Sequence, residues 1–163
     1  MNAAHLHLLF NHVPIIAGIL GTLILVAGMV LRQPAVKRTA LGIFVIAAVA
    51  ALPAFFSGEG AEEIVEKLPG SGESVIESHE DIGKIFLIAM EVLGVFSLIT
   101  FVLDRKNARR TMEFYILVLL ISLFTGVLGA RVGTSGGNIR HPEIQNGASA
   151  PANAPGEQEH DDD

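Results

Sequence analysis

The stretch VPIIAGILGTLILVAGMVL, from Val13 to Leu31, carries no charged side chain. Three similar apolar stretches follow at 39–56, 82–103 and 112–130, interrupted only by Lys84, Glu91 and Glu113. A helix of roughly 20 apolar residues crosses the ~30 Å hydrocarbon core of a bilayer. Because backbone groups in lipid must be hydrogen-bonded within their own segment, a helix is the favoured structure for each stretch. The sequence therefore predicts four transmembrane helices.

The composition excludes several other classes of protein. Of the 163 residues, 50% are hydrophobic and only 17% are charged, whereas about a quarter of a soluble domain is charged. The net charge of −6 argues against nucleic-acid binding, which needs a basic face. The absence of cysteine excludes disulfides and thiolate metal sites.

The loop charges predict how the chain sits in the membrane. Two short connections hold seven of the eleven Lys and Arg residues, namely Arg32, Lys37, Arg38, Arg105, Lys106, Arg109 and Arg110. The connection at 57–81 is instead strongly acidic. Because basic loops stay in the cytoplasm, we expect a multi-pass protein of a bacterial cytoplasmic (inner) membrane. Both termini and the acidic loop are then extracytoplasmic.

The expected fold is all-α, an antiparallel bundle of four transmembrane helices formed by residues 1–145. Small residues at helix-packing spacing, such as Gly21 and Gly28 in the first span, favour close contact between the helices. The acidic loop includes a predicted outer helix, with Glu59, Glu62 and Glu63 on one face. The acidic tail at 146–163 lacks the apolar residues needed to order itself and is predicted to be disordered.

Histidines gather on one side of the predicted membrane protein. Three histidines precede the first span, one precedes the third span and one follows the fourth. In the predicted topology all five are extracytoplasmic: His5, His7, His12, His79 and His141. Residues distant in the sequence are thus expected to converge at one end of the bundle. This convergence predicts a functional site there.

Carboxylates line the approach to the third span. We expect one continuous helix from Glu73 into this span, with Glu77, Glu80 and Glu91 near one face and Lys84 paired with Glu80. A glutamate at the depth of Glu91 is costly in lipid, which makes it a functional candidate. The alternative is a protonated side chain that joins two helices through a hydrogen bond.

The fourth span ends in a glycine-rich segment. Gly133, Gly136 and Gly137 permit positive φ angles, so a sharp reversal is expected here. The reversal would fold Arg140 and His141 over the outer end of the bundle. Arg140 could then pair with Glu62 or Glu63.

Imidazoles with nearby carboxylates are typical of sites for Fe, Cu, Zn or haem. The candidate metal ligands are His12, His79, His141, Glu62, Glu63 and Glu80. Haem b would use His12 or His7 together with His79 or His141, with Arg140 neutralising its propionates. Apolar residues available to line a haem slot are Leu8, Leu9, Phe10, Phe55, Phe56 and Phe86.

Four segments together resemble a family of small bacterial four-span membrane proteins that carry a domain of unknown function. They are His7-Leu-Leu-Phe-Asn-His12-Val-Pro-Ile, Ser57-Gly-Glu-Gly-Ala-Glu-Glu63, Glu77-Ser-His-Glu80 and Gly136-Gly-Asn-Ile-Arg-His141-Pro-Glu143. The resemblance covers roughly residues 5–144. It implies a role for the residues that match these motifs, Asn11, His12, Glu59, Glu62, Glu63, His79, Glu80, Arg140 and His141.

Two functions remain open from the sequence. The first is a membrane protein that binds haem or a transition metal as a redox or electron-transfer accessory, with a membrane or periplasmic redox partner. The second is a non-catalytic scaffold or complex subunit, in which the same residues form a polar cap over the bundle. No motif predicts a reaction, and the oligomeric state stays open.

Overall fold

The computed structural model describes residues 3–58, 60–61 and 73–140, and these residues form five helices without a strand. The helices are α1 (Ala3–Phe10), α2 (His12–Val30), α3 (Pro34–Phe56), α5 (Glu73–Arg105) and α6 (Thr111–Arg140). Four segments are long and apolar enough to cross a membrane: His5–Val30, Pro34–Phe56, Ile76–Arg105 and Thr111–Gly137. The prediction of an all-helical protein with four candidate membrane spans is confirmed.

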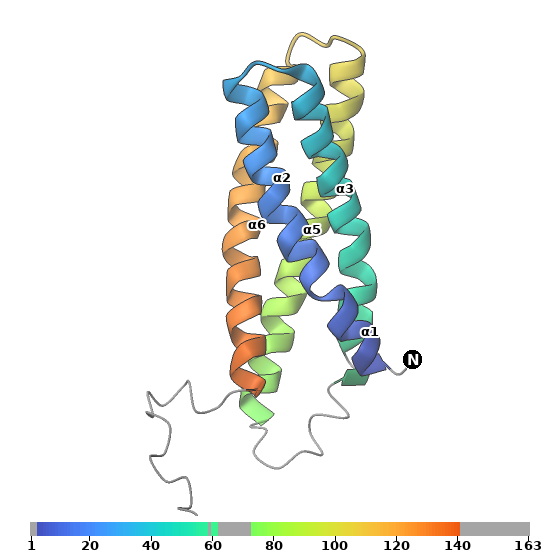
Figure 1. The fold of residues 1–163 in the computed structure, drawn as a ribbon, viewed down its shortest axis with the longest axis vertical. Helices are drawn as coiled ribbons and strands as arrows, with labels where there is room; N and C mark the ends of the chain where they lie inside the picture. Colours follow the sequence, from blue (N-terminus) through green and yellow to red (C-terminus); the bar gives the residue numbers. More distant parts are fainter. Residues whose placement is uncertain (1–2, 59, 62–72, 141–163) are drawn as a thin grey trace, which may run out of the picture.

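The long helices pack around one shared core (Figure 1). Helix α2 contacts α3, α3 contacts α5, α5 contacts α6, and α6 contacts α2. One end of the bundle, which we call the outer end, holds α1, the start of α5 and the end of α6. The opposite end, which we call the basic end, holds the connections from α2 to α3 and from α5 to α6.

Apolar side chains cover the outside of the bundle as well as its core. Leu25, Phe44 and Leu93 are fully buried, whereas Leu23 and Ile88 are 62% and 64% exposed in the middle of their helices. Water would penalise such an exposed belt, but lipid would not. The distribution of apolar side chains therefore fits a protein surrounded by a bilayer.

The interior also contains hydroxyl groups, and most of them are satisfied within their own helix. Thr100 Oγ1 donates to the carbonyl of Phe96 at 2.6 Å. Thr125 Oγ1 donates to the carbonyl of Ile121 at 2.9 Å. Because these bonds need no second helix, the hydroxyls do not fix how the helices are paired.

A break at Asn11 separates α1 from α2. Pro14 has no N–H to offer the carbonyl of Phe10, and its ring crowds the preceding turn. The helix is interrupted at Asn11, three residues before the proline. Helix α1 leans onto α3, whereas α2 packs between α3 and α6 (Figure 1). The break therefore brings the first histidines of the chain over the outer end of α3.

The glycine-rich end of the fourth span does not reverse. Helix α6 continues through Gly133, Gly136 and Gly137 to Arg140, so the predicted sharp turn at 131–140 is wrong. Gly136 instead permits close packing, because a Cβ atom there would lie 3.2 Å from Cε1 of His79. The predicted continuous helix from Glu73 into the third span is confirmed as α5.

The predictions for the acidic outer helix and the tail fall largely outside the described residues. Glu59, Glu62, Glu63 and His141 belong to this part of the chain, as does the segment 146–163. The side chain of Arg140 is also outside the described part.

Both connections at the basic end close in the same way. Arg32 and Asn107 adopt left-handed backbone conformations, with φ angles of 54° and 50°. After α2, Gln33 N–H donates to the carbonyl of Gly28 at 3.0 Å, and Ala108 N–H makes the equivalent bond to Leu103 at 3.0 Å. This is the Schellman pattern of helix termination. The two turns are thus short and internally hydrogen-bonded.

Charged side chains join three helices beneath these turns. Arg38 of α3 pairs with Asp104 of α5. Lys37 Nζ lies 4.4 Å from the ring centroid of Tyr115 of α6, a cation–π contact. Tyr115 is fully buried, and its hydroxyl faces Asp104 without closing a hydrogen bond to a described residue. The sequence analysis did not predict this network, since Arg38 and Asp104 are 66 residues apart.

Candidate functional site

His7 lies on α1 over the outer end of α3. Its Nδ1 atom is 2.8 Å from the carbonyl oxygen of Ala54. A carbonyl oxygen can only accept, so Nδ1 carries the proton and donates it. In the neutral ring, Nε2 then keeps its lone pair. His7 is therefore held in the tautomer that can bind a metal ion through Nε2.

His79 lies near the start of α5 and is held by α6. Its Nδ1 atom is 2.8 Å from the hydroxyl oxygen of Ser135. The same oxygen is 3.0 Å from the carbonyl oxygen of Val132. With the one hydroxyl proton on the bond to Val132, Ser135 accepts from His79, Nδ1 carries the ring proton and Nε2 keeps its lone pair. With that proton on the bond to His79, the ring has the opposite tautomer.

Helix α1, which carries His7, and the start of α5, which carries His79, both lie at the outer end of the bundle (Figure 1). Both side chains are half-buried, and each ring lies against a glycine. A Cβ atom added at Gly58 would lie 3.6 Å from Cε1 of His7, and one at Gly136 would lie 3.2 Å from Cε1 of His79. The two histidines thus share the outer end of the bundle, and their convergence into one site stays a prediction.

Asn11 adds an unsatisfied polar atom beside His7. It follows His7 by one helical turn, and its N–H donates to the carbonyl of His7 at 2.8 Å. Its side-chain oxygen is buried and accepts no hydrogen bond within the described residues. A buried acceptor without a donor is costly, and a bound cation would offset this cost.

Two other sequence candidates do not join this group. His12 is exposed and lies about 200° around α2 from buried Pro14, so it faces away from the core. Glu80 is occupied by Lys84, whose Nζ atom is 3.0 Å from Oε1, which confirms the predicted pair. The ligand roles proposed for these two residues stay predictions.

Glu91 lies in the middle of α5 and is half-buried. Its Oε1 atom is buried and has no hydrogen-bond partner among the described residues. The predicted hydrogen bond to a neighbouring helix is therefore not present in this part of the chain. The functional role predicted for Glu91 is not decided by its position.

The described side chains form neither a cluster of metal ligands nor a slot for haem. Within the described ranges, no group of three or more His, Cys, Asp or Glu residues could hold a metal ion. The apolar residues expected around haem do not enclose a slot. Leu8, Leu9 and Phe56 are exposed, at 66%, 59% and 66%, while Phe86 is buried in the core.

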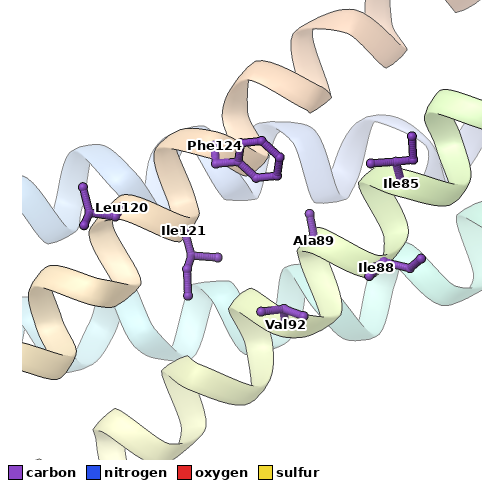
Figure 2. Close-up of a pocket in the computed structure, with 7 residues that line it drawn as sticks. All are labelled: Ile85, Ile88, Ala89, Val92, Leu120, Ile121 and Phe124. Carbon is purple, nitrogen blue, oxygen red and sulfur yellow. The ribbon is translucent and has the colours of Figure 1, made fainter.

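A separate hollow lies between α5 and α6 (Figure 2). It has a volume of about 480 Å³ and is lined only by apolar side chains, Ile85, Ile88, Ala89, Val92, Leu120, Ile121 and Phe124. Several of these residues are more than half exposed, including Ile88 and Phe124. The hollow faces outward into the lipid region and contains no residue of the histidine site.

Ser135 and the carbonyl of Ala54 orient the two imidazoles, and neither was predicted from the sequence. A backbone carbonyl leaves no trace in the sequence. Ser135 could have been considered, because it follows the fourth span at the end where His79 precedes the third. Because a reversal was expected in this glycine-rich segment, Ser135 was not predicted to lie on a helix, whereas in the structure it lies on α6.

No protein-family model, curated protein or solved structure matches the chain. The resemblance to the bacterial four-span family is therefore still a prediction.

Proposed function

We propose that the chain is an integral protein of a bacterial cytoplasmic membrane that binds a transition metal ion at its outer end, as a redox or electron-transfer accessory. The observation that carries the proposal is that His7 and His79 each have a hydrogen-bond partner at Nδ1. Each imidazole has its Nδ1 atom 2.8 Å from an oxygen, and a ring that donates its Nδ1 proton there keeps an Nε2 lone pair for a metal ion. Such partners are typical of histidines that bind metals, since they fix the ring orientation and raise its basicity.

The chemistry of the donors narrows the choice of metal. Imidazole nitrogens suit Fe, Cu and Zn, and of these a bound Fe or Cu ion would supply one-electron transfer. We include the oxygen of Asn11 as a third donor in the proposal, because it is buried without a hydrogen bond within the described residues and follows His7 by one helical turn. Glu62, Glu63 and His141, predicted as further ligands, lie outside the described part of the chain. We favour a metal ion over haem because Leu8, Leu9 and Phe56 do not enclose a slot.

The proposal is tested on the detergent-purified, full-length protein by elemental analysis and absorption spectroscopy after loading with Cu, Fe, Zn or haem. We expect about one transition metal ion per chain and no Soret band. Because the binding nitrogen must be unprotonated, metal affinity should fall as the pH drops below about 6.5, where free imidazole titrates. A protein that retains no metal under any loading condition would remove the proposal.

The topology is a second expected outcome. We propose an antiparallel bundle with the basic end in the cytoplasm, supported by the concentration of basic residues there. A reporter fused after Asn146 should be active only outside the cytoplasm, and one fused after Arg38 only inside. A cytoplasmic signal from the fusion after Asn146 would contradict this orientation and place the histidine site on the inner side.

One observation favours the alternative of a scaffold with a polar cap. The last carbonyls of a helix have no partner within it, and His7 satisfies that of Ala54 at the end of α3. Ser57 Oγ lies 3.1 Å from this carbonyl oxygen and 2.7 Å from that of Pro53, so its one proton is shared between the two. In this alternative His7 ties α1 to α3 and has no metal to bind. The two functions are separated by substitutions that retain the Nδ1 hydrogen bond but remove Nε2.

A further inference from the structure

The basic end of the bundle has a large excess of positive charge. Its helix ends and connections contain seven basic residues but only two acidic residues, Asp104 and Glu113. Arg38 is paired with Asp104, and Lys37 covers the ring of Tyr115. The other five basic side chains are exposed and make no ion pair within the described residues: Arg32, Arg105, Lys106, Arg109 and Arg110.

These five cations lie directly beside the exposed apolar belt. Val30 and Leu31, which precede Arg32, are 74% and 63% exposed, and Met112, which follows Arg110, is 52% exposed. Exposed apolar side chains at the ends of membrane helices belong in the hydrocarbon region. The neighbouring cations are then at the depth of the lipid headgroups, where phosphate groups are concentrated.

The turns that carry these cations are fixed. Arg32 has a φ angle of 54°, a left-handed conformation that glycine would adopt without strain. A charged side chain occupies this strained position, and strain of this kind is a reason to look for a function. The Schellman hydrogen bonds on both sides hold the two connections in place. The backbone that carries the cations is therefore held in place at one end of the bundle.

We propose that the basic end binds the phosphate groups of anionic phospholipids, so that the protein retains such lipids in preference to zwitterionic ones. Guanidinium groups suit this role because they donate two parallel hydrogen bonds to a phosphate. The surface is at the opposite end from His7 and His79, so this inference does not depend on the metal site.

The test is native mass spectrometry of the full-length protein in neutral detergent with equal amounts of phosphatidylglycerol and phosphatidylcholine. We expect phosphatidylglycerol to be retained more strongly, and Arg109→Gln to weaken its binding about fivefold, since each basic residue near an anionic surface contributes modestly to attraction. Arg131→Gln removes an exposed cation from α6 towards the outer end and should change nothing. High salt should weaken phosphatidylglycerol binding and leave phosphatidylcholine binding unchanged.

Arg109→Lys keeps the charge and should retain most of the binding, which controls for damage to the turn. Equal retention of the two lipids by the unaltered protein would overturn the proposal. Equal losses of phosphatidylglycerol binding in Arg109→Gln and Arg131→Gln would also overturn the proposal. If inorganic phosphate alone bound as tightly as the lipid, the surface would be a site for soluble anions. This result would also contradict the phospholipid proposal.

Discussion

Asparagine in place of His79 is expected to remove the bound metal ion from the protein without unfolding it. The side-chain amide of asparagine can place an N–H near the position of Nδ1, so the hydrogen bond to Ser135 is kept. The Nε2 donor is absent, and the metal loses one of two imidazole ligands. His7→Asn should have the same effect, because its amide can still donate to the carbonyl of Ala54.

The measurement is metal content by elemental analysis, alongside helical content and thermal unfolding in detergent. His12→Asn is the matched control, since His12 is exposed and faces away from the core. It should leave the metal content unchanged. If His12→Asn loses the metal while His79→Asn retains it, the ligand set proposed here is wrong.

Ser135→Ala provides a graded test of the same site. It removes the acceptor that orients His79 but leaves the Nε2 donor in place. Loss of a partner that orients a metal ligand typically lowers affinity about 10-fold to 100-fold. An effect of this size on metal affinity, with little effect on folding, would distinguish orientation of a ligand from a purely structural contact.

The scaffold alternative predicts a different pattern. The unaltered protein would hold no metal, and His7→Asn would be as stable as the parent. His7→Ala would lose about 1 kcal/mol, because the carbonyl of Ala54 would keep only its bond from Ser57. Stability measured across these substitutions thus separates the two functions even if metal loading fails.

The candidate spans could be predicted from the sequence because their signal is local. A run of apolar residues such as Val13–Leu31 is sufficient to predict a membrane helix, and the pair of Glu80 and Lys84 follows from spacing within one helix. The pairing of Arg38 with Asp104 could not be predicted, since it depends on how α3 and α5 meet. No pattern within either helix contains that information.

The sequence predicts that both His7 and His12 precede the first span, and it does not distinguish which of them faces the bundle. In the structure His7 contacts the end of α3, whereas His12, which follows the break at Asn11, is exposed. Glycine 136 was expected to permit a turn. Its role is instead to let α6 approach the ring of His79, and these two uses of glycine are indistinguishable in the sequence.

Close packing between α3 and α5 gives the last prediction. A Cβ atom at Gly94 would lie 2.5 Å from the Cβ atom of Ala48. Neither methyl group has a torsion that could move it aside, so Gly94→Ala must push the two helices apart. In a membrane, where helices associate through such close contacts, we expect the substitution to lower the free energy of unfolding by about 1–3 kcal/mol.

Gly126→Ala is the control, because a Cβ atom there meets nothing within 4 Å. It should leave the free energy of unfolding unchanged or raise it by up to about 1 kcal/mol, since alanine is the better helix former. The free energy is measured by titration with a denaturing detergent in mixed micelles.

The decisive variant exchanges the two residues. Ala48→Gly alone should cost about 1 kcal/mol, through the lost methyl group and the weaker helix former. Gly94→Ala with Ala48→Gly puts one methyl group back into the same contact from the opposite helix, so the clash disappears. The double variant should therefore be more stable than the sum of the two single losses predicts, by about 0.5–3 kcal/mol. Additive losses would mean that α3 and α5 do not meet at this pair of residues.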